Sequence, residues 1–261
     1  MLRTVPDILA RIVEHKRSSL AAARARLADL ERRAADSSAL RRDFRAALLA
    51  RDPAIIAEIK RASPSKGVLS PSVAPAATAA AYERGGAAAL SVLTDELFFQ
   101  GSLADLESAR AAVRVPVLRK DFTIDEFHVV EAAAHGADAI LLIAAILEES
   151  ELRRFREQAA VYGMAALVEV HDEDELAVAL RSGAEIIGVN NRDLHTFEVT
   201  LETSLRLARG IPDGVVAVSE SGIHSSGDVQ RLRQAGFRAF LVGEHLMKSP
   251  DPAQALQALL R

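Results

Sequence analysis

Charged side chains stand at or near the ends of several short apolar stretches of the sequence. Glu58 and Lys60 end the stretch AIIAEIK, Lys120 ends VLRK, and Glu169 follows AALV. A lysine that lies beside other cations and loses part of its water has a lowered pKa and can act as a general acid. A glutamate in the same pocket can act as the base. The same lysines could instead form Schiff bases with a carbonyl substrate, so the residue types predict one of two kinds of catalysis.

More polar residues follow the later apolar stretches. Asn190 ends IIGVN, Arg192 comes two residues beyond it, and Glu220 ends VVAVSE. A glycine-containing turn follows VVAVSE at 221–223, and another follows AFLV at 243–244. Backbone N–H groups in such turns and at helix N-termini bind phosphate groups. The pair of turns therefore predicts a site for a phosphorylated substrate.

The elements that must position these residues are short apolar stretches that alternate with amphipathic stretches of helical period. This alternation predicts an α/β protein, and eight strands in roughly 200 residues favour a closed (β/α)8 TIM barrel over an open sheet. Glycines at 85–86, 136, 183 and 236 fall just before strands, where helix ends need a left-handed residue. The predicted strands are 55–60, 88–94, 117–120, 139–143, 165–170, 186–190, 215–220 and 239–243, and a helix at 253–260 ends the chain.

The carboxyl ends of barrel strands meet at one mouth, where active sites of this fold lie. Because side chains alternate along a strand, Glu58 and Lys60 share one side of the first strand, and Ile55, Ala57 and Ile59 share the other. We expect the charged pair to face the barrel interior. Five strand ends would then bring lysine, glutamate, asparagine and arginine together, which is hard to explain as solvated surface.

Residues 1–48 precede the barrel, which spans 49–261, and predict a helical extension of two helices. Val5, Ile8, Leu9, Ile12 and Val13 form an apolar stripe at helical spacing. Residues 1–50 hold 11 Lys and Arg against 6 Asp and Glu. Since alanine and leucine separate these arginines and no aromatic residue precedes Phe44, we interpret them as a solvated helix face and expect no nucleic-acid partner.

The composition excludes several classes of site. The chain has 261 residues and no cysteine, which rules out disulfides, thiolate metal sites and a cysteine nucleophile. Its seven histidines form no HExxH motif, so we expect neither a metal nor an organic cofactor. His171 is the nearest candidate ligand, and we expect it in a surface loop, pointing away from Glu169.

No signal peptide or membrane-length apolar run is found, which favours a cytoplasmic protein without membrane contact. The oligomeric state stays open, with a monomer as the simplest expectation.

At this point the motifs resemble those of the indole-3-glycerol-phosphate synthase family. The resemblance covers the whole barrel in order, together with an N-terminal extension of the expected size. It rests on AEIKRASPSKG at 57–67, LSVLTDELFFQGS at 90–102, PVLRKDF at 116–122, ALVEVHDEDEL at 166–176, GVNNRDL at 188–194, SESGI at 219–223 and LVGEHLM at 241–247.

The resemblance implies a substrate in which an anthranilate-type ring is joined through its nitrogen to a deoxyribulose phosphate. It implies that Lys120 is the acid that protonates the ketone oxygen, that Glu169 is the base, and that Lys60, paired with Glu58, is the second acid. The order of the two lysines is left open. The other implied residues orient the substrate's polar groups (Asn190, Arg192, Glu220, Ser221), bind phosphate (Ser63, Gly222, Gly243, Glu244) or form apolar walls around the ring (Phe99, Phe122, Leu141, Leu194).

One residue departs from the family pattern. His245 stands where the family often has a small hydroxyl residue, in GESLM, and the sequence does not decide whether the histidine replaces that hydroxyl or faces solvent.

Two functions other than the one that the resemblance implies also fit the sequence. One is a Schiff-base aldolase that uses Lys60 or Lys120. The other is an inert phosphate-binding barrel, although a binder needs no acid and base at opposite strand ends.

Overall fold

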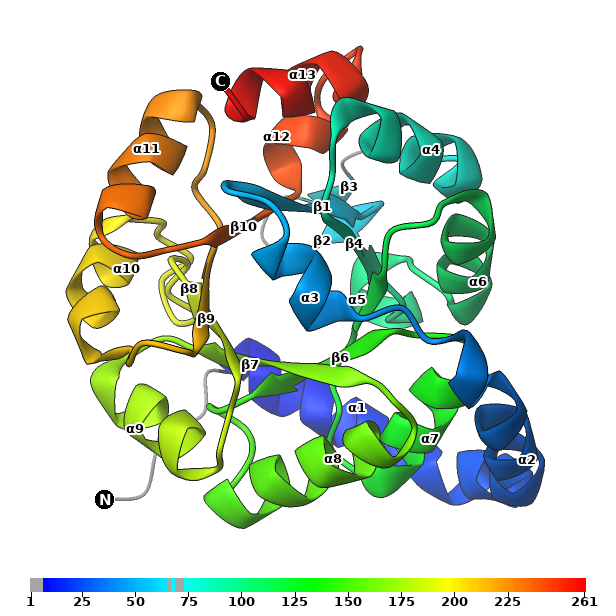
Figure 1. Ribbon diagram of the computed structural model, residues 1–261. Helices are drawn as coiled ribbons and strands as arrows, with labels where there is room; N and C mark the ends of the chain where they lie inside the picture. Colours follow the sequence, from blue (N-terminus) through cyan, green and yellow to red (C-terminus); the bar gives the residue numbers. More distant parts are fainter. Residues whose placement is uncertain (1–6, 65–66, 69–72) are drawn as a thin grey trace.

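Eight parallel strands close into a barrel in the computed structural model, which describes residues 7–64, 67–68 and 73–261 (Figure 1). The order around the barrel is β1-β10-β9-β8-β7-β6-β5-β4, so β1 closes the sheet by pairing with both β4 and β10. Each strand begins and ends within one residue of its predicted bounds, and the predicted (β/α)8 TIM barrel is confirmed. The strands are β1 (Ala54–Ile59), β4 (Ala89–Leu93), β5 (Val117–Lys120), β6 (Ala139–Ile143), β7 (Ala165–Val170), β8 (Ile186–Asn190), β9 (Val216–Glu220) and β10 (Ala239–Val242).

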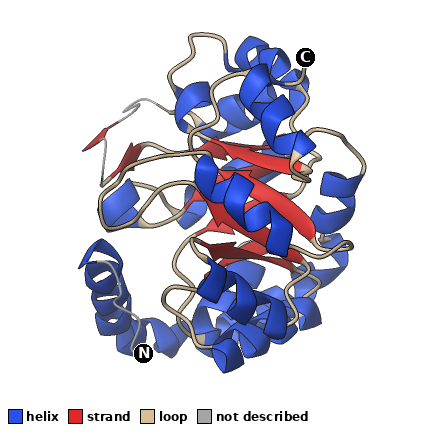
Figure 2. Cartoon of the chain, turned by 90° about the vertical axis from the view of Figure 1, so that its left-hand side faces the viewer, coloured by secondary structure: helices blue, strands red, loops and turns tan. Residues whose placement is uncertain are grey.

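Helices surround the strands, as the side view in Figure 2 shows. Two short strands that the sequence did not predict, β2 (Ala62–Ser63) and β3 (Gly67–Val68), form an antiparallel pair after β1. The helices between and after the barrel strands are α4 (Pro75–Gly85), α5 (Glu96–Phe99), α6 (Leu103–Ala112), α7 (Glu126–Ala134), α8 (Glu149–Val161), α9 (Glu173–Arg181), α10 (Glu202–Leu207), the 3-10 turn η3 (Ala208–Gly210), α11 (Ser226–Gln234), α12 (Glu244–Met247) and α13 (Pro252–Leu259).

Glycines end several helices in the predicted conformation. Gly86 has φ 102° after α4, and Gly236 has φ 106° after α11. A side chain at such a φ would place Cβ against the backbone, which is why glycine is favoured there. The same left-handed conformation occurs at Gly136 and Gly183, so the predicted helix stops are confirmed.

Alternation along the strands divides the apolar residues into two cores. On β1, Ile55, Ala57 and Ile59 pack outward against the helices, whereas Ile56 packs inward with Leu118. Glu58 has the same parity as Ile56 and therefore faces the barrel interior, as predicted. Burial of both faces explains why these strands read as nearly continuous apolar runs.

The N-terminal extension contains one helix more than the sequence predicted. It comprises α1 (Asp7–Ala23), η1 (Arg24–Arg26), α2 (Leu27–Ser37), η2 (Ser38–Leu40) and α3 (Phe44–Leu49). The short α3 lies across the barrel end that faces the viewer in Figure 1, and its buried Phe44 and Leu48 join the interior core. Six residues carry too little periodic signal to reveal such a helix from sequence. The division of the chain at residue 48 stays a prediction, and Val5, Ser65 and Lys66 lie outside the described residues.

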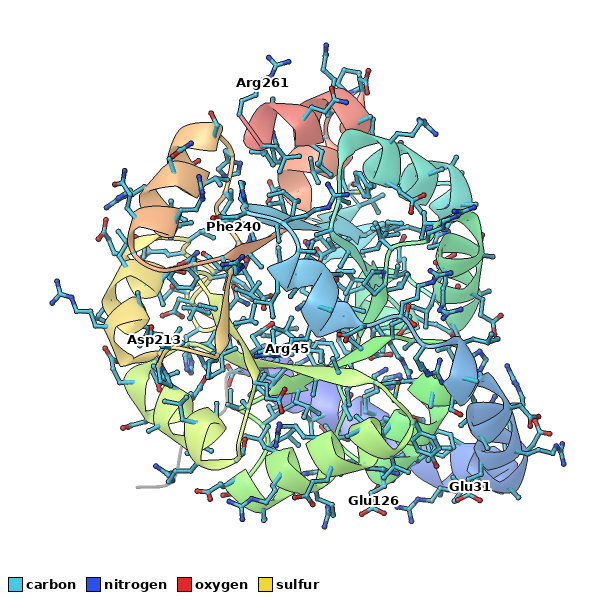
Figure 3. The ribbon with its side chains drawn as sticks, viewed as in Figure 1. Glu31, Arg45, Glu126, Asp213, Phe240 and Arg261 are labelled. Atoms are coloured by element: carbon cyan, nitrogen blue, oxygen red, sulfur yellow. The ribbon has the colours of Figure 1, made fainter. Side chains whose placement is uncertain are left out.

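Helix α1 lies at the opposite end of the barrel, over the carboxyl ends of the strands. The Lys16 ammonium on α1 lies 3.2 Å from a carboxylate oxygen of Asp95 and 2.6 Å from one of Asp121. Both aspartates are buried, so this pair of contacts ties the extension to the loops after β4 and β5. Charged residues such as Glu31, Glu126, Asp213 and Arg261, which Figure 3 labels, are exposed to solvent.

Candidate active site

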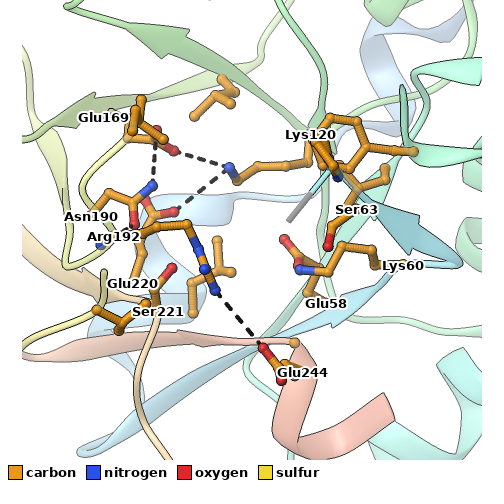
Figure 4. A pocket seen from close by; sticks show the side chains of 18 of the residues that line it. Glu58, Lys60, Ser63, Lys120, Glu169, Asn190, Arg192, Glu220, Ser221 and Glu244 are labelled. Carbon is orange, nitrogen blue, oxygen red and sulfur yellow. Dashed lines mark hydrogen bonds and ion pairs between the residues drawn. The ribbon is translucent and has the colours of Figure 1, made fainter. Parts of the chain in front are cut away.

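A cavity of about 520 Å³ opens at the carboxyl ends of the barrel strands. Every residue that the sequence predicted for the site lines it, from all the predicted strand ends and turns (Figure 4). These residues are Glu58, Lys60, Ser63, Phe99, Lys120, Phe122, Leu141, Glu169, Asn190, Arg192, Leu194, Glu220, Ser221, Gly222, Gly243 and Glu244.

Lys120 lies among carboxylates. Its ammonium is 3.0 Å from Oε2 of Glu169 and 3.8 Å from Oε2 of Glu220. Burial alone would lower the pKa of Lys120, but the neighbouring glutamates outweigh it and raise that pKa above its ordinary value. The expectation of a lowered lysine pKa is therefore wrong for Lys120, because its nearest charged neighbours are anions. Lys120 is protonated at neutral pH and holds a proton that it can donate.

Glu169 is buried at the end of β7 and faces the cavity. Its Oε2 accepts the hydrogen bond of Lys120, and its Oε1 accepts one from the Asn190 amide at 3.2 Å. Burial would raise the pKa of Glu169, but the Lys120 cation, helped by His171, lowers it well below the ordinary range. The carboxylate is therefore ionised at neutral pH, as a base must be.

Glu220, from β9, is mostly protonated and therefore neutral at pH 7, unlike Glu169. Burial, together with the negative charges of Glu169 and Glu58, raises its pKa to about 8, although Lys120 opposes the shift. Its Oε1 has no hydrogen-bond partner among the described residues. Gly188 makes room for this carboxyl group, since a Cβ there would collide with Oε1 of Glu220. Two glutamates close to one lysine thus differ in protonation, which allows one to accept a proton and the other to donate a hydrogen bond.

Lys60 and Glu58 form a second acid–carboxylate pair across the cavity from Glu169 (Figure 4). The Lys60 ammonium lies 2.5 Å from Oε1 of Glu58. Gly243 packs against this pair, because a Cβ at that position would lie 2.5 Å from the same Glu58 oxygen. The site therefore holds two lysines on different strands, each with its own carboxylate partner.

The turns after β8, β9 and β10 form the remaining polar wall. The backbone N–H of Arg192 donates to Oδ1 of Asn190 at 3.0 Å, and the Arg192 guanidinium lies 3.8 Å from Oε2 of Glu244. Ser221 has φ 68° and Gly222 has φ 78°. Two successive left-handed residues turn the chain sharply after β9, and this turn lines the cavity next to the loop after β10.

Apolar side chains line another part of the cavity. The rings of Phe99 and Phe122 lie 6.0 Å apart between centroids at 38° to each other. Leu141 and Leu194 also belong to the interior core or pack against it. A cavity with aromatic and aliphatic residues and with clustered charges suits a ligand with a flat ring and a polar, anionic chain.

The structure corrects the expectation for His171. Its imidazole is largely buried and lies between two carboxylates, with Nε2 3.4 Å from Oε1 of Glu169 and Nδ1 3.0 Å from Oε2 of Glu175. Residues two apart share a side of an extended chain, and this parity continues one step past the end of β7. His171 therefore points toward Glu169 rather than away from it.

Sequence reasoning missed several residues that line the cavity. Ile8, Leu9 and Ile12 of α1 reach it, as does His224. The ring of His224 lies 6.0 Å between centroids from that of His245, whose place the sequence left open. The apolar stripe of α1 was visible in the sequence, but nothing showed which surface it covers. His245 lines the cavity, so it does not simply face solvent. Burial, with the nearby His224, lowers the pKa of His245.

Within the described part of the chain, no helix is long and apolar enough to cross a membrane.

The barrel resembles that of the thiamine phosphate pyrophosphorylase from Pyrococcus furiosus. The TM-score is 0.59 at 16% identity, and the match covers 78% of this chain and 92% of the other. That likeness concerns the fold alone.

Sequence comparison identifies the family. The family model described as indole-3-glycerol phosphate synthase matches residues 9–259. The chain is 51% identical over 258 residues to the indole-3-glycerol phosphate synthase of Leptothrix cholodnii, covering 97% of this chain and 98% of that protein. It is 52% identical over 258 residues to the one of Albidiferax ferrireducens, with the same coverage. The chain belongs to the indole-3-glycerol phosphate synthase family, whose members are decarboxylating lyases of tryptophan biosynthesis.

Proposed function

We propose that this cavity closes the indole ring of indole-3-glycerol phosphate from 1-(2-carboxyphenylamino)-1-deoxyribulose 5-phosphate, with loss of carbon dioxide and water. The observation that carries the proposal is the pairing of Lys120 with Glu169 at 3.0 Å inside the cavity. A protonated acid beside an ionised base is what two successive proton transfers in opposite directions require. Family membership supports the same reaction.

The first step is ring closure. The ring carbon that bears the carboxylate attacks the ketone carbon, and Lys120 gives its proton to the ketone oxygen. The C–COO⁻ bond then breaks, carbon dioxide leaves, and its electron pair restores the aromatic ring. Lys120 fits this role because its raised pKa keeps it protonated until the ketone oxygen gains negative charge.

The second step is loss of water. Lys60 donates a proton to the hydroxyl group formed in the first step, and that group leaves as water. Glu169 takes a proton from the carbon next to the nitrogen, and the new double bond completes the indole. The pair Lys60 and Glu58 fits the role of acid because it lies across the cavity from the base. The assignment of one lysine to each step is part of the proposal.

The other cavity residues bind the substrate. We assign the phosphate to Ser63, Gly222, Gly243 and Glu244, with backbone N–H groups rather than the Glu244 carboxylate facing the anion. Asn190, Arg192, Glu220 and Ser221 orient the carboxylate and hydroxyl groups. Phe99, Phe122, Leu141 and Leu194 hold the aromatic ring. The protein would thus act in the cytoplasm on a small phosphorylated molecule, as a monomer and without cofactor, nucleic acid or membrane.

Product analysis tests the proposal against the aldolase alternative. The purified chain is incubated with the substrate, with and without borohydride. The masses of the small molecules and of the protein are then measured by mass spectrometry. The proposal predicts a product lighter than the substrate by carbon dioxide plus water, and an unmodified protein. A borohydride-trapped adduct on Lys60 or Lys120 would instead support Schiff-base chemistry, for which the raised pKa of Lys120 is unsuited.

A further inference from the structure

His171 stands directly behind the cavity wall. It follows the last residue of β7 and precedes Asp172, which caps the N-terminus of α9. Glu169 lines the cavity and His171 is not among its lining residues, but the imidazole contacts the Glu169 carboxylate. The His171 side chain is 15% exposed. The direct contact of His171 with a cavity residue is the one with Glu169.

Glu175 on α9 fixes the orientation of the imidazole. One carboxylate oxygen of Glu175, Oε2, accepts a hydrogen bond from the backbone N–H of His171 at 2.8 Å and lies 3.0 Å from Nδ1 of its ring. Glu175 is itself buried, at 7% exposure. With Nδ1 held by Glu175, the other ring nitrogen, Nε2, lies 3.4 Å from Oε1 of Glu169, which is an ion-pair contact rather than a hydrogen bond. Such a carboxylate behind an imidazole fixes the ring orientation and favours its charged form.

The surrounding charges favour an imidazolium. Burial would lower the pKa of His171, but the contacts with Glu169 and Glu175 outweigh it and raise that pKa to about 10. Beyond Glu169 lie the Lys120 ammonium on β5 and the largely protonated Glu220 on β9, both of which also interact with Glu58. Glu169 is thus flanked by two cations, Lys120 at Oε2 and His171 at Oε1.

We propose that His171, held by Glu175, is a positioning residue that keeps the Glu169 carboxylate ionised and oriented throughout the reaction. The inference rests on the proposed function, in which Lys120 gives up its proton before Glu169 acts. At that moment the cation at Oε2 is lost, and an isolated buried carboxylate would tend to take up a proton. The imidazolium at Oε1 remains and preserves the ionised base until the substrate carbon gives up its hydrogen.

The test is the pKa of the Glu169 carboxyl group, followed by NMR on protein labelled with ¹³C in glutamate side chains. His171→Gln keeps a side-chain N–H donor but removes the charge, so the Glu169 pKa should rise by about one unit or more. Glu175→Gln retains the imidazole but weakens its charge, so the rise should have the same sign and be smaller. His135→Gln is the matched control, because His135 contacts Glu107 at 2.7 Å outside the active site. It should leave the Glu169 titration unchanged.

Kinetics give the second readout. The acidic limb of the kcat profile should move to higher pH in His171→Gln, while KM changes less than about twofold, because His171 does not touch the substrate. A folded His171→Gln protein with an unchanged Glu169 titration and an unchanged acidic limb would overturn the inference. The NMR titration needs no substrate. An inactive wild-type protein would therefore refute the proposed function, while the titration still decides whether His171 controls Glu169.

Discussion

The ammonium of Lys120 and the carboxylate of Glu169 lie 3.0 Å apart although they come from β5 and β7, which are not neighbours in the barrel. β6 lies between them and contributes Leu141 to the cavity, so the two charged side chains meet over one intervening strand, beside an apolar residue. This relationship explains both pKa shifts. Each group stabilises the charged form of the other where burial alone would favour the neutral form.

Lys120→Met removes the proposed first acid while retaining much of the side-chain length. We expect kcat to fall at least about 10²-fold, because a general acid acts chiefly in the transition state. Binding of the product, measured by calorimetry, should change far less than kcat. Near-normal turnover would mean that Lys60 serves as the acid in both steps or that Lys120 is only structural.

Gly243→Ala tests the pairing of Lys60 with Glu58 through kcat at saturating substrate, since Gly243 is also assigned to the phosphate site and weaker phosphate binding raises KM instead. The new Cβ would lie 2.5 Å from Oε1 of Glu58 and 3.2 Å from its Cβ, so the carboxylate must move. A displacement of this kind at a catalytic group lowers the rate by roughly 10-fold to 10²-fold.

The matched control is Gly227→Ala in α11. A Cβ there meets only Oγ of Ser225, at an ordinary 3.5 Å, and alanine favours the helix. This variant should retain wild-type kcat and equal or higher stability. If both alanine variants retained wild-type turnover, the Glu58 contact would not matter for the reaction.

Glu220 predicts a pH dependence of stability. Its pKa is about 8 in the folded protein, against an ordinary value of 4.5 in the unfolded chain. The folded state therefore holds one more proton between these values, so Glu220 makes stability fall as pH rises through this window, by at most about 1.4 kcal/mol per pH unit. Glu220→Gln removes this contribution. In urea titrations from pH 5 to 9, the variant should gain stability relative to the wild type as pH rises; a constant difference would contradict the raised pKa.

Metal removal should leave activity unchanged, because Lys120, Lys60 and Glu169 supply every proton transfer of the proposed reaction. No group of three or more metal-ligating side chains lies within the described ranges. Exhaustive dialysis against a chelator, followed by a rate measurement, checks this expectation. A loss of rate that only a divalent cation restores would refute it.

The barrel and its site residues could be predicted because their signals are local. Each strand is a short β-branched or apolar run, and glycines such as Gly86 and Gly236 mark the helix ends that precede strands. Once the fold is a parallel barrel, the last polar residue of each strand is placed at the mouth without further information. Lys120, Glu169 and Asn190 were found in this way.

The missed features depend on contacts between distant segments. The direction of the Lys120 pKa shift was predicted wrongly, because the sequence does not show that Glu169 and Glu220 are its nearest charged neighbours. Ile8 and Ile12 read only as an apolar stripe until the surface that they cover was known. His171 was misread for a local reason, since it lies two residues after Glu169 and side chains two apart share a side of an extended chain.

The most direct test of the acid–base account is the initial rate of indole absorbance at saturating substrate, measured for the wild type and Glu169→Gln side by side. Glutamine keeps the volume of the side chain and removes its basicity, so the account predicts a rate lower by roughly 10² to 10⁴ in a protein that still folds. If Glu169 served only as a buried ion-pair partner, the variant would instead lose about 3 to 5 kcal/mol of stability. Normal turnover per folded Glu169→Gln molecule would contradict the account.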